Sequence, residues 1–386
     1  MRKPLSIVAL LVLVVSALAG QASGGPTTGG LATDNIEHVK HLPIAQNGVG
    51  GRLIGKYFYM NDQNKVMVYD VSDPVNPEMI GFVAMPQEWQ FSREDIDGNG
   101  KILVVPNTVS GQNDGNVQTQ AAANAVYIID VEDKTNPKII SKVPGAAQHT
   151  FSCVLDCKWA YGSGGNIIDL RNPAKPKLVD SKWGEGTPGG NGGHDVEEVA
   201  PGMVMTATQP MMLLDARKDP AHPKLVSVAE RTEEYMHQAR WPRSMSDRFL
   251  LAASETTMNG KCNERSGSFQ TWDARSWKKG TFKLIDKYVP TNGIIADGKP
   301  VAQRNCTAHW IEEHPDFKNG GYVASGFYDH GTRFFEVTST GKIKEAGYFM
   351  AYAGQASAAY WITDEIVYTV DYNRGLDILR FTPPKG

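Results

Sequence analysis

The chain has 386 residues, a net charge of -3 at neutral pH and a hydrophobic fraction of 41%. It is long enough to bury a large core, and length alone would allow two domains. The sequence has no basic run, which excludes nucleic acid as an expected partner because phosphate binding needs clustered lysine and arginine.

The N-terminal residues have the features of a secretion signal. Two basic residues precede an apolar run from Leu5 to Leu18, and small residues suited to cleavage follow. The run is too short to span a bilayer, no second apolar stretch of about 20 residues follows, and no nearby cysteine could carry a lipid. We therefore expect residues 1–19 to be a signal peptide, residues 20–33 a flexible linker, and the mature protein to be secreted, extracellular and without a membrane span.

One sequence pattern recurs along the rest of the chain. It reads VMVYDVSDPVNPEMIGFVAMP from residue 66, and strong or weaker copies begin near residues 126, 166, 211, 269, 332 and 376. Each copy begins with an apolar, β-branched run, and the clearest ones continue through an Asp-Pro or Asn-Pro turn into a second run. Asp and Pro favour such turns through local hydrogen bonds and a preset φ. Short strands separated by turns at regular spacing are typical of all-β folds.

Two further strand-like runs precede each copy, for example HTFSCVLD and KWAYGSG between residues 149 and 164. Four strands in about 40 to 60 residues match one blade of a β-propeller, and seven such units can be counted. The last unit stops at Phe381 after its third strand, and residues 35–43 read as a fourth strand without a third. The sequence thus predicts an all-β fold, a single seven-bladed β-propeller over residues 34–386. Its N-terminal strand would complete the last blade and remove an exposed sheet edge.

The turn pattern VYDVSDPVNPEMIG resembles the repeats of the LVIVD-repeat family of bacterial and archaeal surface or secreted propellers. The segments CTAHW, SGFYDHGTRFFEV and VDYNRGLDILRF also resemble the last blades of members of that family. The resemblance covers most of the mature chain and implies the propeller fold. It implies no particular chemistry, because a fold does not determine function.

Four of the nine histidines occupy the same place in consecutive units, about twelve residues before the second strand. They are His149, His194, His237 and His309. Glutamines take this place in the other three units, at Gln46, Gln90 and Gln355. The innermost strands of a propeller all run the same way along the central channel. We therefore expect these side chains to form one ring, with the four imidazoles on one arc.

We expect the four imidazoles to bind one transition-metal ion. An imidazole nitrogen binds such an ion at about 2.0 to 2.1 Å, and neutral imidazole suits copper, iron, zinc and nickel. Export favours copper slightly, iron is the other main candidate, and zinc is possible. The alternative is a polar plug, in which the His and Gln side chains hydrogen-bond one another and water in the channel.

By architecture alone, such a centre resembles two known kinds of propeller. These are the four-His iron site of carotenoid cleavage oxygenases and the His-lined copper site of methanethiol oxidase-type propellers, although the sequence motifs of both are absent. Asp195, Glu197 and Glu312 lie near the histidines in sequence and could orient them. His330 is expected in a turn on the same face, as a proton shuttle or as a plain surface histidine.

Four cysteines in an exported chain predict two disulfides. Cys153 and Cys157 flank one tight turn and are expected to pair locally. Cys262 lies in a long loop and Cys306 lies at the start of the next unit, so a disulfide between them would link two segments on that face. Long loops at 107–125 and 255–268 are expected on this face as well, where they would frame a pocket.

These features favour a secreted, monomeric metalloprotein that is a redox or oxygenase-type enzyme acting on a small-molecule substrate. The alternative is a non-catalytic extracellular or cell-surface propeller that binds an extracellular ligand and whose His and Gln ring is structural. The two hypotheses differ in whether the purified protein holds stoichiometric metal.

Overall fold

The computed structural model describes residues 29–385 apart from the segments 44–47, 63, 87–93, 108–123, 147–149, 180–181, 191–192, 256–266, 291–294, 297–298 and 301–305. The described residues are mostly β-structure, which confirms the predicted all-β class. Their helical elements are short, namely α2 (Pro242–Met245) and the 3₁₀ turns η2 (Ser163–Gly165) and η3 (Trp277–Lys279). None of the described helices is long and apolar enough to cross a membrane.

The strands form antiparallel units of four, which we number in chain order. Unit 1 comprises β3 (Gly50–Ile54), β4 (Tyr57–Asn61), β5 (Lys65–Asp70) and β6 (Glu78–Ala84). Unit 2 comprises β7 (Asp97–Gly98), β8 (Ile102–Asn107), β9 (Ala125–Asp130) and β10 (Lys138–Pro144). Unit 3 comprises β11 (Phe151–Val154), β12 (Trp159–Gly162), β13 (Ile167–Asp169) and β14 (Lys177–Val179).

Units 4 and 5 are the two halves of one eight-stranded sheet, joined where the outer strands β18 and β22 run parallel over two residue pairs. Unit 4 comprises β15 (Val196–Ala200), β16 (Met203–Thr206), β17 (Met212–Asp215) and β18 (Lys224–Ala229). Unit 5 comprises β19 (Tyr235–Arg240), β20 (Phe249–Glu255), β21 (Phe269–Asp273) and β22 (Thr281–Tyr288).

Units 6 and 7 include the N-terminal strands. Unit 6 comprises β25 (Ile311–Glu313), β26 (Gly321–Gly326), β27 (Thr332–Val337), β28 (Ile343–Ala351) and, at its outer edge, β1 (Gly30–Ala32). Unit 7 comprises β29 (Ala356–Trp361), β30 (Ile366–Asp371), β31 (Gly375–Phe381) and β2 (Ile36–Leu42). A separate hairpin is formed by β23 (Ile295–Ala296) and β24 (Lys299–Pro300).

The N-terminal strand pairs with the C-terminal one at the place expected from the sequence. Ile36 lies opposite Phe381 and Leu42 opposite Leu376 in an antiparallel ladder. Gly30–Ala32, which lie within the predicted linker, form strand β1 against β28. Gly30 suits this close approach, since an added Cβ would lie 2.5 Å from the carbonyl oxygen of Met350.

The repeated turn has the same physical cause in units 1 to 5. The Oδ1 atom of Asp70 accepts a 2.9 Å hydrogen bond from the backbone N–H two residues later. Equivalent bonds are made by Asp130, Asp169, Asp215 and Asp273. This local bond bends the chain as each third strand ends, so that the fourth strand returns along the outer edge.

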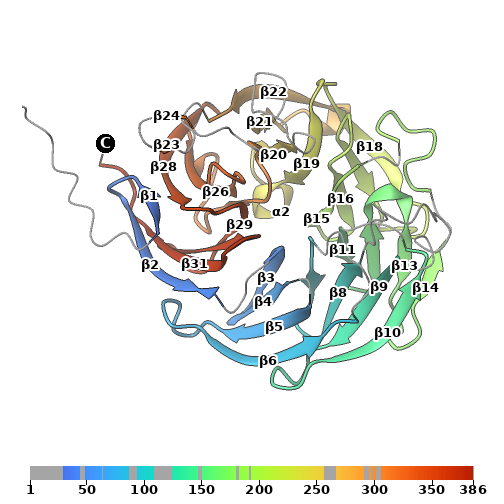
Figure 1. The fold of residues 1–386 in the computed structure, drawn as a ribbon. Coiled ribbons are helices and arrows are strands. Elements are labelled where there is room, and N and C mark those ends of the chain that lie inside the picture. Colours follow the sequence, from blue (N-terminus) through green and yellow to red (C-terminus); the bar gives the residue numbers. More distant parts are fainter. Residues whose placement is uncertain are drawn as a thin grey trace, which may run out of the picture.

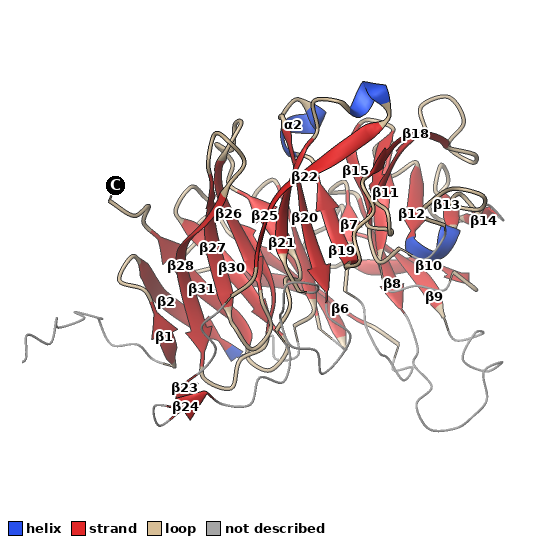
Figure 2. Ribbon diagram, turned by 90° about the horizontal axis from the view of Figure 1, so that it is seen from above, coloured by secondary structure: helices blue, strands red, loops and turns tan. Residues whose placement is uncertain are grey.

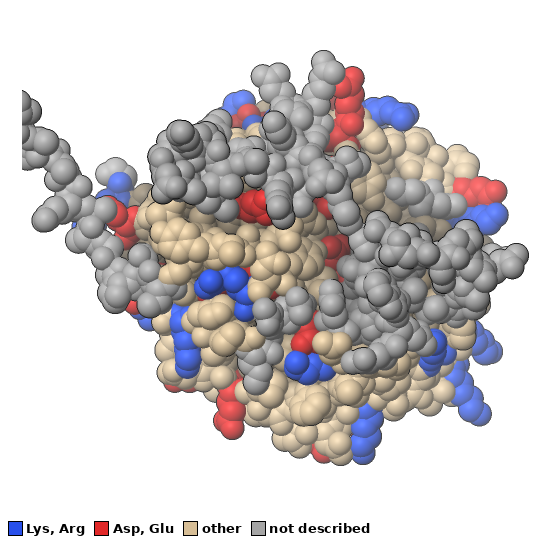
Figure 3. Space-filling model, in the orientation of Figure 1, with Lys and Arg blue, Asp and Glu red and all other residues tan. Residues whose placement is uncertain are grey.

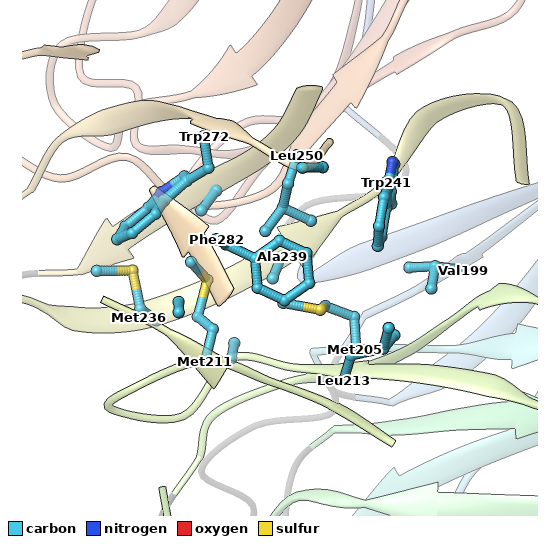
Figure 4. Close-up of a cluster of buried hydrophobic side chains, with 14 of the residues drawn as sticks. Val199, Met205, Met211, Leu213, Met236, Ala239, Trp241, Leu250, Trp272 and Phe282 are labelled. Atoms are coloured by element: carbon cyan, nitrogen blue, oxygen red, sulfur yellow. The ribbon is translucent and has the colours of Figure 1, made fainter. Parts of the chain in front are cut away.

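Apolar clusters fill the space between neighbouring units. Between units 4 and 5, Met205 and Leu213 face Leu250, Trp272 and Phe282 (Figure 4). Burial of each such large side chain contributes roughly 1.5–3 kcal/mol. The cluster that holds Phe58 and Tyr368, whose rings meet edge to face at 5.3 Å, packs unit 7 against unit 1.

The units surround a centre, and Figure 1 shows β3, β11, β15 and β29 nearest to it. Figure 2 shows the hairpin β23–β24 on the side of the sheets opposite to α2. On the face in Figure 3, small patches of described acidic and basic side chains are scattered, both near the middle and at the rim. This scatter agrees with the absence of a basic run in the sequence.

One predicted disulfide is confirmed. Cys153 and Cys157 are bonded across the turn between β11 and β12. In that turn Leu155, Asp156 and Cys157 all adopt positive φ, a region that costs about 1–2 kcal/mol per residue for L-amino acids, so the bridge holds a strained turn. Cys306 is also disulfide-bonded, and Cys262, its predicted partner, lies outside the described residues.

Candidate metal centre

Four buried side chains from the inner ends of four units come together. They are Glu94 just before β7, His194 just before β15, His237 within β19 and His309 just before β25, with exposed fractions of 6%, 5%, 0% and 0%. Three of the four predicted histidines therefore meet. His149, Gln46 and Gln90 lie outside the described residues.

The three imidazoles lie in a row. The rings of His194 and His237 stack with centroids 3.7 Å apart, and those of His237 and His309 are 3.9 Å apart. His237 is thus in the middle, between its neighbours from the adjoining units. This order follows from the equivalent positions of the three residues in consecutive units.

Backbone carbonyl groups orient the two outer imidazoles. His194 donates from Nδ1 to the carbonyl oxygen of His237 at 3.2 Å, and His309 donates from Nδ1 to that of Ser357 at 2.8 Å. A carbonyl only accepts, so Nε2 of each ring is left without a proton when the imidazole is neutral. This arrangement is typical of metal-binding histidines, whose second nitrogen is fixed by a hydrogen bond.

Glu94 faces all three rings. Its Oε2 lies 3.1 Å from Nε2 of His194 and 3.7 Å from Nε2 of His237, while its Oε1 lies 3.1 Å from Nε2 of His309. His237 has no hydrogen-bond partner on either ring nitrogen among the described residues. A fully buried imidazole in that state costs free energy unless another group binds it.

The charges within this group are strongly coupled. Burial alone would raise the pKa of Glu94, but His309, His194 and His237 hold it well below its usual value. Burial alone would lower the pKa of His194, and the hydrogen bond and charge of Glu94 raise it instead. Burial, together with His194 and His309, keeps the pKa of His237 well below its usual value. Without a metal, the favoured state is an ionised Glu94, a protonated His194 and a neutral His237.

Two tyrosines hold the carboxylates next to the imidazoles. Tyr372 donates to Oε1 of Glu94 at 2.6 Å, and Tyr328 donates to Oε1 of Glu255 at 3.0 Å. Burial and nearby groups raise the pKa of both phenols well above the usual value, chiefly Glu94 for Tyr372, and Tyr372 and Glu255 for Tyr328. Both hydroxyls therefore keep their protons and act as donors.

The backbone of Tyr328 has an uncommon conformation and is held by contacts with unit 7. Its φ is 44°, in the left-handed region, and its N–H and C=O are both bonded to Ala356 of unit 7. The ring centroid lies 4.6 Å from that of His309 and 5.8 Å from that of Tyr372. Strain of this kind persists only where surrounding contacts enforce it, and it is common at functional sites.

The donor atoms fall into two sets that could each hold an ion. One set is Glu94, His237 and His309, and the other is His194, His237 and Glu255, with ligand atoms in each set within 4.8 Å of one another. Each set has two imidazoles and one carboxylate, a combination suited to first-row transition metals such as iron. The residues therefore fit a metal ion, whose identity the geometry leaves open.

A polar cavity lies among the inner strands of several units. It is lined in part by Asp95, Asp195, Gln238 and Trp310, which directly follow Glu94, His194, His237 and His309 in the chain. Two arginines also line it. Arg52 pairs with Asp97 at 3.0 Å, and Arg240 pairs with Glu197 at 3.0 Å and Glu313 at 2.7 Å.

Carboxylates outnumber these arginines, so the cavity is acidic. Burial and Asp97 raise the pKa of Asp95 to about 8, and burial raises that of Glu312 to about 7. Burial and Asp95 raise the pKa of Asp195 well above its usual value. At neutral pH these raised pKa values favour the protonated, uncharged forms of Asp95 and Asp195.

The remaining predicted site residues lie elsewhere. Asp195, Glu197 and Glu312 line the cavity, and no described hydrogen bond joins them to the imidazoles. The Gln355 backbone N–H bonds Asp371, and Ser357, two residues later, is the unit 7 residue next to His309. His330 is not the surface histidine that we considered. It is 1% exposed, its ring nitrogens have no partner among the described residues, and burial lowers its pKa to about 4.

Sequence reasoning missed both carboxylates and both tyrosines. The sequence contains a pattern that could have identified Glu94, because Glu94-Asp95-Ile96-Asp97 resembles His194-Asp195-Val196-Glu197. The tyrosines also repeat, as YDHG from Tyr328 and YNRG from Tyr372 in the equivalent turns of units 6 and 7. No pattern in the sequence pointed to Glu255.

Comparison with known proteins adds no assignment. No family model matches the chain, and no curated protein shows significant similarity to it.

Proposed function

We propose that this protein is a secreted, seven-bladed β-propeller metalloenzyme that carries a transition-metal centre on His194, His237, His309 and Glu94. Its reaction would be of the redox or oxygenase type on a small molecule. The observation that carries the proposal is His237, which is fully buried with two ring nitrogens that have no hydrogen-bond partner among the described residues. A metal ion bound to such an imidazole offsets its cost of burial.

The propeller assignment is supported by the four-stranded units, by the repeated aspartate turn and by the pairing of β2 with β31. The likeness of that turn to the LVIVD repeats agrees with it. Secretion is supported by the N-terminal sequence and by the Cys153–Cys157 disulfide, a bond that persists in oxidising compartments.

The donor set shifts the preferred metal from copper towards iron. A carboxylate now joins the imidazoles, and a combination of two histidines and one carboxylate with open positions is the usual ligand set of non-haem Fe(II) oxygenases. Tyr235, which is 39% exposed, lies edge-on to His194 at 6.2 Å. A small molecule could approach past Tyr235, whereas the imidazoles themselves are closed to bulk solvent.

The test is elemental analysis of the purified chain after anaerobic loading with Fe(II), Cu(II) and Zn(II) in separate samples. We expect stoichiometric Fe(II) in the wild type and a loss of most of it in His237→Ala. His222→Ala is the matched control, because His222 is an exposed turn residue bonded to Asp219 and its loss should change nothing.

Oxygen uptake by the Fe(II)-loaded protein tests the redox assignment separately. Uptake that exceeds that of His237→Ala supports it. A metal content that is negligible, or equal in the wild type and His237→Ala, would favour the non-catalytic alternative, in which the buried group is a structural plug. Stoichiometric zinc binding without oxygen uptake would support the metal centre and contradict the proposed redox activity.

A further inference from the structure

We infer that the centre binds two metal ions side by side, with the carboxylate of Glu94 between them. This inference deepens the proposed function and depends on it. One position is formed by His309 and Oε1 of Glu94, and the other by His194, Glu255 and Oε2 of Glu94. His237 lies between them and completes one of the two.

The first argument is that the ligand atoms form two overlapping sets. Glu94, His237 and His309 make up one set, and His194, His237 and Glu255 make up the other, with the ligand atoms of each set within 4.8 Å of one another. His237 is common to both sets, whereas His309 belongs only to the first and Glu255 only to the second. Each set by itself offers the two imidazoles and one carboxylate that can hold one ion.

The second argument is the orientation of Glu94. Its two oxygens face different imidazoles, since Oε2 lies 3.1 Å from His194 and Oε1 lies 3.1 Å from His309. A carboxylate that bridges two ions presents its oxygens in this way, one to each ion. Paired ions in two-metal sites lie about 3.5–4 Å apart, a spacing that two oxygens of one carboxylate can serve.

The third argument is the supply of donors. Three imidazoles and two carboxylates exceed what a single two-histidine, one-carboxylate site uses. Glu255 belongs only to the second set, where Tyr328 donates a hydrogen bond to it at 3.0 Å.

The test is a Co(II) titration of the metal-free full-length protein, followed by gel filtration and elemental analysis. We expect two equivalents of Co(II) per chain in the wild type. Glu255→Gln and His309→Ala each remove a ligand from one position only, so each should retain one equivalent. Glu336→Gln is the control, because Glu336 is on β27 and pairs with Lys344 at the surface, and it should retain two.

Electron paramagnetic resonance of the Mn(II)-loaded protein gives an independent readout. Two ions bridged by Glu94 should give a spin-coupled spectrum, and Glu255→Gln should convert it to the spectrum of an isolated ion. Circular dichroism establishes that each variant is folded. One equivalent in the wild type, with an isolated-ion spectrum, overturns the two-ion arrangement and leaves the proposed function intact. No bound metal at all overturns both.

Discussion

The hydroxyl of Tyr372 donates a 2.6 Å hydrogen bond to Oε1 of Glu94. The two residues are 278 positions apart and come from units 7 and 2. The bond orients a buried carboxylate whose other contacts are imidazoles. It thus links unit 7 to the candidate metal centre.

Replacing Tyr372 with Phe should weaken metal binding without abolishing it. Loss of a residue that orients a metal ligand typically costs 10–100-fold in affinity, roughly. Competition with a chelator would measure the change. Tyr322→Phe is the matched control, because Tyr322 packs against Phe381 away from the centre. Equal affinities for the wild type and Tyr372→Phe would show that the hydroxyl does not position Glu94.

Metal uptake should depend on pH through His194. Burial opposes the charged form, but Glu94 raises the pKa of His194 above its usual value of about 6.5. A bound metal must displace this proton, so affinity should rise with pH until His194 has lost it. Calorimetry in two buffers of different ionisation enthalpy would count the released proton. Affinity that is constant between about pH 6 and 9 would contradict this prediction.

The stability of the metal-free protein should fall as pH rises, which is opposite to the trend in metal affinity. Because the folded pKa of His194 is raised, its pairing with Glu94 is fully present below the unfolded pKa of about 6.5 and is lost as pH rises through the folded value. Thermal melting of the apoprotein across this range provides the internal check.

Asp377→Asn should destabilise the junction between the chain ends. Asp377 is buried in β31 and accepts hydrogen bonds from His38 at 2.8 Å and His41 at 2.9 Å, both in β2. Burial alone would raise the pKa of Asp377, but His38 and Arg374 lower it to about 2. The shift corresponds to about 2 kcal/mol of stability, which is present above the unfolded pKa of about 3.9 and lost as pH falls through about 2.

Denaturant unfolding of Asp377→Asn and of the wild type would measure this contribution. The variant should lose about 2 kcal/mol at neutral pH, and the difference should shrink as pH approaches 2. Asp316→Asn, at an exposed turn, is a suitable control. A difference that is the same at pH 7 and pH 2 would mean that the carboxylate charge is not what joins β2 to β31.

Deletion of residues 31–43 should abolish cooperative folding. The deletion removes all of β2 and most of β1, so it exposes the edges of β31 and β28 and takes away both histidine partners of Asp377. Exposed edges of this kind promote aggregation. Differential scanning calorimetry would test it, with deletion of residues 20–28 as the control. An unchanged melting transition after loss of 31–43 would contradict a ring closed by β2.

Local sequence determined the strands and turns of this protein, and tertiary structure decided which side chains meet at the candidate metal centre. The aspartate turns, the β2–β31 pairing and the Cys153–Cys157 bridge were predictable because short-range hydrogen bonds, alternation of side chains and close spacing produce them. Counting residues back from the second strand of each unit also identified His194, His237 and His309 as neighbours, since equivalent positions in repeated units have similar surroundings.

The same counting selected Gln90 instead of Glu94, because the distance to the second strand differs between units. His237 precedes Phe249, the first residue of β20, by 12 residues, whereas Glu94 precedes Ile102, the first residue of β8, by 8 residues. Sequence also could not show that His194 and His309 contact different oxygens of Glu94, or that Tyr372 from unit 7 reaches Glu94 in unit 2. Such contacts depend on how whole sheets pack around a common centre, and short-range propensities carry no information about those distances.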